Sequence, residues 1–321
     1  MESLKTFEVL DPGILTTIQD LGRYGFSQFG VPPSGSLDPF SLRIGNLLVG
    51  NREEEASLET TLPGLKLRAV REVVVAVTGG DLCPVLNGES FEMWRTHLLV
   101  EGDVLSFKKI QNGCRAYVAV GGGIAVASVM GSKSTCLSGG FGGLDGRALQ
   151  RGDILHVPDV PVRMDKLGVR FPTESIPLYS RESILHVIPG PQDQHFTGAG
   201  FETFYFGAYR VTPQSNRTGI RLEGARIERR AEVEASIISE PLLPGAIQVP
   251  GDGKPIIVLT ELVTGGYTKI ATVISTDLPK VGQLKPGDQV DFTPVSLETA
   301  HHSLRKQEEQ IERFRDGLLR R

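Results

Sequence analysis

Residues 149–155 read LQRGDIL, and the same pattern recurs as LVEGDVL at 99–105 and LKPGDQV at 284–290. Each copy has leucine, two residues, Gly-Asp, one residue, and then leucine or valine. Gly-Asp favours a tight turn, and the apolar residue that follows it is typical of a β-strand. We therefore expect each copy to be a turn that enters a strand. The copies near residues 155 and 290 would then close two successive β lobes.

Other short apolar runs bounded by turn residues occur through residues 1–295, for example EVVVAVTGG at 72–80, RAYVAVGGG at 115–123 and KPIIVLT at 254–260. The 321 residues include 38 glycines and 20 prolines, together about 18% of the chain against about 12% in average proteins. Glycine destabilises the interiors of helices and strands, so this excess predicts many turns and excludes a long helical bundle. The expected fold class is mainly β, with few short helices and a C-terminal helix.

The polar stretch between two strand-like segments, ILHVP and ILHVIP, predicts a division of the chain. We expect an N-terminal β lobe at 1–160, a linker at 161–182, a C-terminal β lobe at 183–295 and a helical tail at 296–321. The spacing of the runs is too irregular for a solenoid or a propeller.

One internal helix is well signalled by LDPFSLRIGNLLVGN at 37–51. Asp38 is a good N-cap, Pro39 suits the first helical position, and Gly50 can end the helix. Apolar residues at helical spacing give this segment one buried face. The last 25 residues show a second helical pattern with a narrow apolar stripe, which we expect to pack on the body or on a partner.

The charge balance and the cysteines exclude several classes of function. The chain has 34 basic and 38 acidic residues and a net charge of −4, with no basic stripe of the kind that binds nucleic acid. Its apolar runs are far shorter than the roughly 20 residues needed to span a bilayer, and its N-terminus lacks a signal peptide pattern. The three cysteines form no CxxC pair, so we expect a cytoplasmic protein without a metal site.

Standard catalytic motifs do not account for the glycine-rich region at 121–153. GSKST at 131–135 suggests a phosphate-binding loop, but Ser132 separates Gly131 from Lys133, whereas a Walker loop needs Gly-Lys-Ser/Thr. A nucleophile elbow and an HExxH motif are also absent from the sequence. We interpret the region as turns between strands.

The segment 16–51 carries polar residues among glycines and prolines instead of on a periodic face. They include Gln19, Asp20, Arg23, Ser34 and Asp38. Such a turn-rich segment can hold polar groups at a binding surface. The alternative is structural: Asp38 caps its helix, and Arg23 pairs with Asp20.

Further candidates lie in the C-terminal half. Arg217 and Arg221 are four residues apart and could clamp a carboxylate or phosphate, or they could be strand-edge residues paired with a nearby glutamate. Gln248 lies on a predicted short strand. Thr264 opens the turn TGGY, in which Tyr267 could cover a cleft or be an ordinary turn aromatic.

Eight segments of the sequence, taken in order, resemble the allophanate hydrolase subunit 2 family, which is also called the biotin-dependent carboxyltransferase family. Together they extend over about residues 7–293. The segments are TTIQDLGRYGFSQFGVPPSGSLD (16–38), NLLVGN (46–51), YVAVGGGIAV…MGSKST (117–135), GGLDGRALQRGD (142–153), NRTGIRLEG (216–224), GAIQVPGDGKPIIVL (245–259), TGGYTKIATVISTDL (264–278) and LKPGD (284–288).

The resemblance implies two cyclophilin-like β-barrel lobes and a component of a larger complex. It implies the C subunit of an ATP-dependent 5-oxoprolinase, which opens the lactam of 5-oxo-L-proline to L-glutamate. The implied partners are a KipI-like B subunit and a LamB/YcsF-like A subunit, with ATP as cosubstrate at a component that the sequence does not identify. We expect the chain to be inactive or weakly active alone.

Two alternatives stay open. One is a biotin-dependent carboxyltransferase of the urea carboxylase type, in which biotin would arrive on another protein, because no biotinylation motif is present. The other is a KipA-like regulator that binds a KipI-like kinase inhibitor. The chain has no biotin-carrier or carboxylase module, which favours the 5-oxoprolinase component.

Motif position under this resemblance also assigns site residues. The catalytic candidates are Asp38, Gln248 and Tyr267. The substrate-binding candidates are Arg23, Ser34, Arg217, Arg221 and Thr264. Family members usually carry Asp-x-Gln-Thr before Gly-Gly-Tyr, whereas this chain has TELVTGGY at 260–267, so that side of the pocket is expected to differ.

Overall fold

The structure is a computed structural model that describes residues 2–319. The first residue of the predicted N-terminal lobe and the last two of the predicted tail lie outside the described residues. The chain divides into two compact units, one made of residues up to 25 with 34–179, and the other of 26–33 with those from 180 onward. The predicted boundaries, with lobes at 1–160 and 183–295 joined by a linker at 161–182, stay a prediction.

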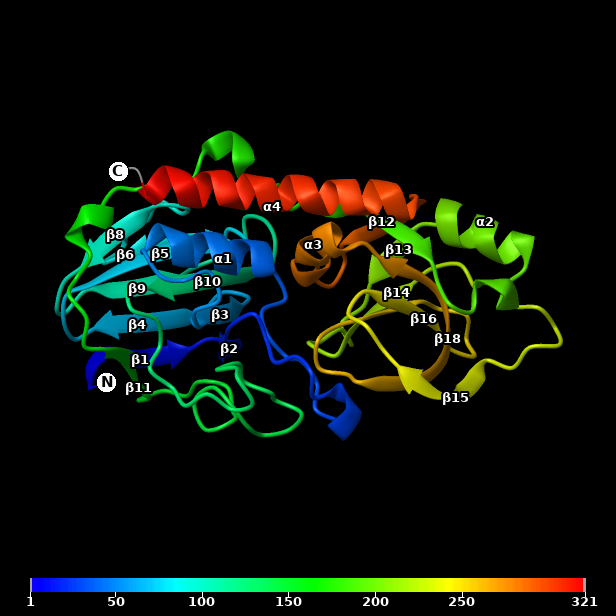
Figure 1. The fold of residues 1–321 in the computed structure, drawn as a ribbon, viewed down its shortest axis with the longest axis horizontal. Coiled ribbons are helices and arrows are strands. Elements are labelled where there is room, and N and C mark those ends of the chain that lie inside the picture. Colours follow the sequence, from blue (N-terminus) through cyan, green and yellow to red (C-terminus); the bar gives the residue numbers. More distant parts are fainter. Residues whose placement is uncertain (1, 320–321) are drawn as a thin grey trace. The chain divides into compact units, whose positions relative to one another are not determined.

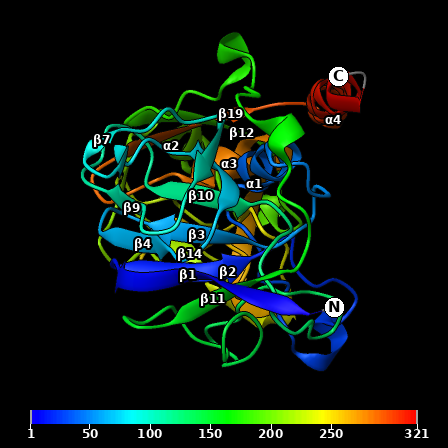
Figure 2. The same ribbon diagram turned by 90° about the vertical axis from the view of Figure 1, so that its left-hand side faces the viewer.

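The first unit consists of two β-sheets and one α-helix (Figure 1). The six-stranded sheet has the order β11-β1-β4-β9-β6-β7, and the five-stranded sheet has the order β2-β3-β10-β5-β8. In the larger sheet β1 lies between β11 and β4 and is antiparallel to both (Figure 2). The elements are β1 (Ser3–Pro12), β2 (Leu15–Gln19), α1 (Pro39–Leu48), β3 (Ser57–Thr61), β4 (Leu65–Ala69), β5 (Val73–Gly79), β6 (Pro84–Leu86), β7 (Glu89–Ser90), β8 (Thr96–Leu99), β9 (Val104–Phe107), β10 (Arg115–Val120) and β11 (Ile154–Pro158), with short 3₁₀ helices η2 (Met164–Lys166) and η3 (Thr173–Ser175).

The two sheets share one apolar core, to which both contribute buried side chains. From the larger sheet come Phe7, Val9, Leu67, Leu105 and Val157, and from the smaller sheet Leu58, Val75, Val77 and Val118. The opposite face of the smaller sheet is covered by α1, which packs on β5 and β10 (Figure 1). Because both of its faces are covered, β5 is buried along its whole length. This unit therefore contains strands in which apolar residues alternate with polar ones and strands that are apolar throughout. The first kind is expected where one face of a strand is covered, and the second where both faces are covered.

The predicted helix within 37–51 is confirmed as α1. Asp38 is its N-cap and accepts the backbone N–H of Ser41 at 2.9 Å, and proline occupies the first turn. Gly50 follows the helix in the left-handed region, at a φ of 79°. Part of the predicted linker packs on this unit, because the ring of Phe171 lies 6.0 Å from that of Phe40.

The second unit is a closed barrel with helices around it (Figure 1). Its sheet has the order β12-β19-β13-β14-β17-β16-β18-β15, and an additional antiparallel pairing between β12 and β18 closes seven of these strands into the barrel. The elements are η1 (Ser27–Phe29), β12 (Glu182–Pro189), η4 (Asp193–His195), α2 (Gly198–Phe206), β13 (Tyr209–Val211), β14 (Gly219–Glu223), β15 (Ser236–Pro241), β16 (Ala246–Val249), β17 (Ile256–Val258), β18 (Thr264–Val273), η5 (Ser275–Asp277), α3 (Leu278–Gly282), β19 (Gln289–Pro294) and α4 (Leu297–Leu319). The predicted mainly β fold is confirmed.

The three Gly-Asp repeats form the same turn and enter β9, β11 and β19, as predicted. In each copy the glycine has a left-handed φ, between 88° and 93°. In each copy the aspartate carboxylate also accepts the backbone N–H of the residue three positions earlier. The pairs are Val100–Asp103 at 2.8 Å, Gln150–Asp153 at 2.7 Å and Lys285–Asp288 at 3.1 Å. The carboxylate satisfies a backbone donor at the turn, which explains why aspartate follows glycine.

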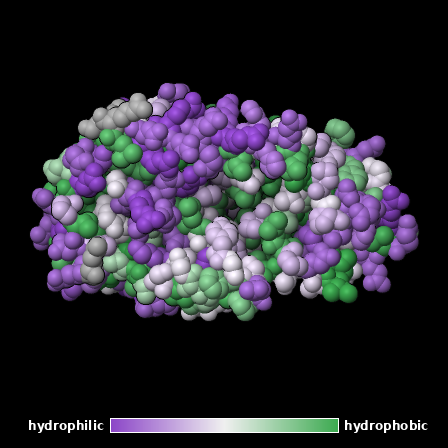
Figure 3. Space-filling view, in the orientation of Figure 1, coloured by the Kyte–Doolittle hydropathy of each residue, from purple (hydrophilic) through white to green (hydrophobic). Residues whose placement is uncertain are grey.

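The C-terminal helix predicted from the sequence is α4. Ile311 and Leu318 are its buried residues, and its outer surface is hydrophilic in Figure 3. Among the described residues, no helix is long and apolar enough to cross a membrane.

Candidate functional site

The glycine-rich loop of the first unit is held by the carboxylate of Asp20. This carboxylate accepts the backbone N–H of Lys133 at 2.6 Å and the hydroxyls of Ser132 at 2.7 Å and Ser134 at 2.5 Å. It also accepts the N–H of Gly22 at 2.7 Å. A phosphate-binding loop offers such donors to an anion from outside. Here an internal carboxylate takes them, so the GSKST segment does not fit the phosphates of ATP.

Arg23 is 2% exposed and also contacts this loop. Its Nη2 donates to the carbonyl oxygen of Ser134, and its Nε donates to that of Val129 at 3.4 Å. Its guanidinium carbon lies 4.8 Å from the ring centre of Phe141. These contacts hold the loop in place, and a substrate-binding role for Arg23 stays a prediction.

Ser34 has a strained backbone conformation and lies beside the segment that carries Asp20 and Arg23. Its φ is 53°, in the left-handed region that non-glycine residues rarely adopt, and it is 1% exposed. The hydroxyls of Ser34 and Ser36 and the Oε1 atom of Gln19 are buried, and none has a hydrogen-bond partner among the described residues. Buried polar atoms without partners are uncommon and cost stability. Ser34 therefore stays a binding candidate.

Asp38 is fully buried in a network of hydroxyl groups. Its carboxylate accepts the hydroxyls of Ser41 at 2.7 Å and Tyr179 at 2.6 Å, besides the N–H of Ser41. Its own N–H donates to the hydroxyl of Tyr117 at 2.8 Å, which donates to Glu59 at 2.7 Å. Burial and the nearby Asp38 charge raise the pKa of Tyr179. The geometry establishes the capping role, and a catalytic role stays a prediction.

In the second unit, Gln248 lies beneath the TGGY segment. The register of the β16–β18 pairing shifts between Ile247 and Gln248, where β18 has one extra residue, and Gln248 pairs with Lys269 of β18. The Gln248 side chain is 4% exposed, and its Nε2 has no hydrogen-bond partner among the described residues. A Cβ atom on Gly265 would lie only 2.4 Å from Nε2. Glycine at 265 is therefore what leaves room for the Gln248 amide.

Tyr267 and Thr264 lie on opposite faces of β18, because side chains alternate along a strand. Tyr267 shares its face with Gly265 and Lys269 and is 40% exposed. Lys269 pairs directly with Gln248, so Gln248 and Tyr267 belong to the same face. Thr264 is exposed and belongs to the other face. The structure thus brings two of the predicted catalytic residues to one side of the strand.

Lys269 is the charged residue that the sequence analysis missed on this face. Its Nζ donates to Glu240 of β15 at 2.8 Å, and Nε2 of Gln192 donates to the same carboxylate oxygen at 2.9 Å. Oε1 of Gln192 accepts the backbone N–H of Lys269 at 3.2 Å. The hydrogen bonds from Lys269 and then Gln192 lower the pKa of Glu240. The only signal in the sequence was a lone lysine directly before the largely apolar stretch IATV at 270–273, and this pattern does not indicate a partner for the lysine.

The two arginines predicted as a clamp have different surroundings. Arg217 is buried, and its Nε donates to Glu261 at 2.8 Å. Arg221 is exposed on β14. A clamp that uses both guanidinium groups stays a prediction. Glu261 belongs to the TELVTGGY segment and stands at the aspartate position of the family pattern, whereas Val263 stands where the pattern has glutamine.

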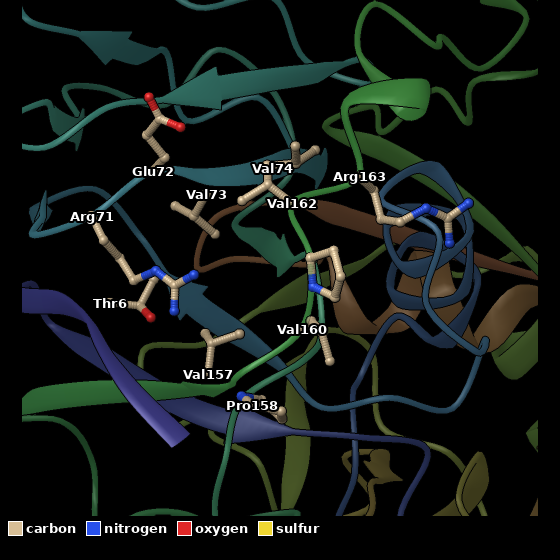
Figure 4. Close-up of a pocket in the computed structure, with 12 residues that line it drawn as sticks. Thr6, Arg71, Glu72, Val73, Val74, Val157, Pro158, Val160, Val162 and Arg163 are labelled. Atoms are coloured by element: carbon tan, nitrogen blue, oxygen red, sulfur yellow. The ribbon is translucent and has the colours of Figure 1, made fainter. Parts of the chain in front are cut away.

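Two cavities in the first unit lie away from these residues. A cavity of about 20 Å³ is lined by Thr6, Arg71 and several valines (Figure 4), and it has room for about one water molecule. A second cavity, of about 370 Å³, is lined mainly by apolar residues, including Phe91 and Trp94, together with Asp81. None of the eight predicted site residues lines either cavity. Among residues 2–319, no group of three His, Cys, Asp or Glu side chains could hold a metal ion.

A two-sheet unit followed by a seven-stranded barrel with a polar face defines a mainly β, two-unit protein. The chain belongs to the carboxyltransferase domain family, subdomains A and B, whose pattern matches residues 29–294. It is 36% identical over 309 residues to the 5-oxoprolinase C subunit of Escherichia coli K12, and the match covers 96% of this chain and 97% of the relative.

Urea amidolyases form a second group of relatives. The chain is 35% identical over 331 residues to urea amidolyase of Lachancea kluyveri, but it spans only 18% of that protein. The crystal structure of the Kluyveromyces lactis urea amidolyase superimposes with a TM-score of 0.91 at 34% identity, covering 98% of this chain and 20% of that one. The resemblance noted from the sequence is confirmed.

Proposed function

We propose that this chain is the C subunit of an ATP-dependent 5-oxoprolinase, which hydrolyses 5-oxo-L-proline to L-glutamate. The observation that carries the proposal is the match to the Escherichia coli 5-oxoprolinase C subunit, which runs over nearly the full length of both proteins. The 5-oxoprolinase C subunit from Haemophilus influenzae shows the same coverage at 32% identity. In the urea amidolyases, by contrast, the part that matches this chain is less than a fifth of the protein's length.

The chemistry requires activation of a poor electrophile. A five-membered lactam resists attack by water, and transfer of a phosphoryl group from ATP to its carbonyl oxygen would make that carbon a better electrophile. Water can then add to the carbon, the ring C–N bond breaks with the nitrogen leaving as the amino group, and hydrolysis of the resulting acyl phosphate gives L-glutamate and phosphate. The GSKST segment does not fit the phosphates, because Asp20 takes its donors. We therefore propose that ATP binds mainly to the partner proteins, a KipI-like B subunit and a LamB/YcsF-like A subunit.

The residues of this chain would bind and orient the lactam. On the polar face of β18, Gln248 offers a buried amide, Tyr267 a partly exposed ring, and Lys269 a buried ammonium group. These groups can donate hydrogen bonds to carbonyl or carboxylate oxygens. We propose that the chain is part of a lactam-opening amidohydrolase and that it is inactive without its partner subunits.

The direct test is reconstitution. The chain is purified with its KipI-like and LamB/YcsF-like partners, and 5-oxo-L-proline-dependent ATP hydrolysis and glutamate release are measured together. We expect the two products in equal amounts from the full complex and neither from this chain alone. A full complex that leaves 5-oxo-L-proline unchanged would contradict the proposal.

The second candidate is a biotin-dependent carboxyltransferase, favoured by the structural similarity to urea amidolyase. In this case carboxybiotin on another protein would supply the carboxyl group for urea. Carboxylation of urea that avidin blocks would support it. Tight binding of the KipI-like partner without any turnover would instead support a KipA-like regulator.

A further inference from the structure

A buried ammonium group in the barrel unit is neutralised by a carboxylate that reaches solvent. The Lys269 side chain is 4% exposed, whereas its partner Glu240 is 45% exposed. A buried cation needs an anionic partner, because removing it from water is costly. The partner need not be Glu240 if another carboxylate can reach the same donors.

Glu240 lies on the strand most easily separated from the barrel. β15 is at the end of the sheet, outside the closed ring of strands, and within residues 2–319 it pairs only with β18. Its pairing is interrupted between Ser236 and Glu240. Segments with few backbone pairs open at lower free energy than core strands. The Lys269 side chain, in contrast, comes from β18, which pairs with β16 and β12 within the barrel.

The donors around Lys269 are fixed in place. Gln192 donates from Nε2 to Glu240, and its Oε1 accepts the N–H of Lys269, so both ends of the amide are held. Gln248, which pairs with Lys269 across the strands, has a buried Nε2 without a hydrogen-bond partner among the described residues. A buried donor without an acceptor destabilises the folded protein. An incoming carboxylate has two oxygens and could satisfy this donor as well.

We propose that Lys269, Gln192 and Gln248 form a binding site for the carboxylate of a small substrate, and that Glu240 is an internal carboxylate which the substrate displaces. This inference rests on the proposed function, because 5-oxo-L-proline carries one carboxylate next to its lactam ring. Tyr267, on the same face of β18, presents a partly exposed ring beside the site. The site therefore distinguishes small amides with a carboxylate from those without one.

The test compares three ligands by ligand-observed NMR on the full chain. 5-Oxo-L-proline has both groups, 2-pyrrolidinone has the same lactam without the carboxylate, and acetate has the carboxylate alone. We expect Glu240→Gln to tighten the binding of 5-oxo-L-proline and acetate by roughly tenfold, the effect of about 1.4 kcal/mol, because the competing charge is removed. The affinity for 2-pyrrolidinone should not change.

Two further variants serve as controls. Lys269→Met should abolish the preference for 5-oxo-L-proline over 2-pyrrolidinone. Glu223→Gln removes the same charge from a surface pair with Lys254 in the same unit, and it should leave all three affinities unchanged. If Lys269→Met does not fold, Glu240→Gln decides the question. This variant should fold, because residue 240 is half exposed and the oxygen of the new amide can still accept both hydrogen bonds.

The outcomes separate this inference from the proposed function. Unchanged or weaker carboxylate binding in Glu240→Gln would overturn the inference and leave Glu240 as a structural partner, even if the wild-type complex hydrolyses 5-oxo-L-proline. Tighter acetate binding in Glu240→Gln would support the inference even if that complex shows no turnover. A wild-type chain and a Glu240→Gln chain that both bind none of the ligands would also overturn it.

Discussion

The backbone N–H of Lys133 donates to the carboxylate of Asp20 at 2.6 Å, across 113 positions of the sequence. This contact distinguishes the glycine-rich loop from a nucleotide-binding loop, although both gather backbone donors and hydroxyls around an anion. Here the anion is part of the fold. The loop is thereby fixed against the end of β2 and serves to hold the first unit together.

The first prediction concerns Lys133. Its Nζ pairs with Glu55, and both side chains are about a quarter exposed, so Lys133→Ala should cost at most about 1 kcal/mol of unfolding free energy. Because the loop does not hold phosphate, the KM of the reconstituted complex for ATP should stay within about twofold of wild type. Steady-state kinetics measure this. A rise of tenfold or more would show that the lysine contacts the nucleotide.

The second prediction concerns the two glycines of the TGGY segment. A Cβ at Gly265 would meet the Gln248 amide at 2.4 Å, whereas one at Gly266 would meet no atom closer than 3.1 Å. Gly265→Ala should therefore displace Gln248 and lower kcat/KM of the complex by roughly tenfold or more, and Gly266→Ala should change it much less. Equal effects of the two variants in folded complexes would remove Gln248 from the candidate site.

The third prediction concerns Asp38. In Asp38→Asn an NH2 group, which donates hydrogen bonds, replaces one carboxylate oxygen, so the donors of Ser41 and Tyr179 can no longer all be accepted. We expect the unfolding free energy to fall by about 2 kcal/mol, the usual cost of leaving buried groups unpaired. Denaturant unfolding measures it, and Tyr179→Phe, which removes one of those donors, is the matched variant.

Activity of the same variant tests the catalytic role of Asp38. Full turnover per folded complex would make Asp38 a capping residue alone. A loss of turnover in a complex that stays folded would support participation of its carboxylate in the reaction.

The fourth prediction is a pH dependence at the second Gly-Asp turn. Arg147 hydrogen-bonds Asp153 and lowers the pKa of its carboxyl. A lowered folded-state pKa stabilises the protein above the ordinary carboxyl pKa of about 4, and this contribution is lost as the pH falls through the folded value. Asp153→Asn should therefore cost about 1 kcal/mol at pH 7 and less at pH 3. Asp103→Asn, at the same turn position beside the neutral amide of Asn87, is the control.

Local features were predictable from the sequence because their causes are local. The Gly-Asp turns depend on a glycine and a carboxylate within four residues, and α1 depends on Asp38 and Pro39 at its start. The arrangement of the strands was harder to derive. Two packed sheets and a closed barrel use the same short apolar runs, and the barrel of the second unit closes through the pairing of β12 with β18, which no local pattern indicates.

The contacts of the candidate site depend on long-range register, which local patterns do not encode. The sequence indicated Gln248 and Tyr267 through their motif, and the structure brings them to one face of the barrel. It gave no reason to join Lys269 to Glu240, because these residues are 29 positions apart and meet only through the pairing of β15 with β18. Asp20 and Lys133 are a similar case.

The pairing of β12 with β19 has a consequence for the order in which the protein is made. β12 (Glu182–Pro189) needs β19 (Gln289–Pro294) as its parallel neighbour, and β13 pairs with β19 on the other side. Paired residues of β12 and β19, such as Glu182 and Gln289, are 107 positions apart in the sequence, so a growing chain cannot close the barrel until β19 has left the ribosome. During that interval the edges of β12 and β13 that pair with β19 stay unpaired. The barrel unit should therefore be the part that depends most on chaperones during synthesis, and nascent chains stalled before Gln289 should be sensitive to protease there.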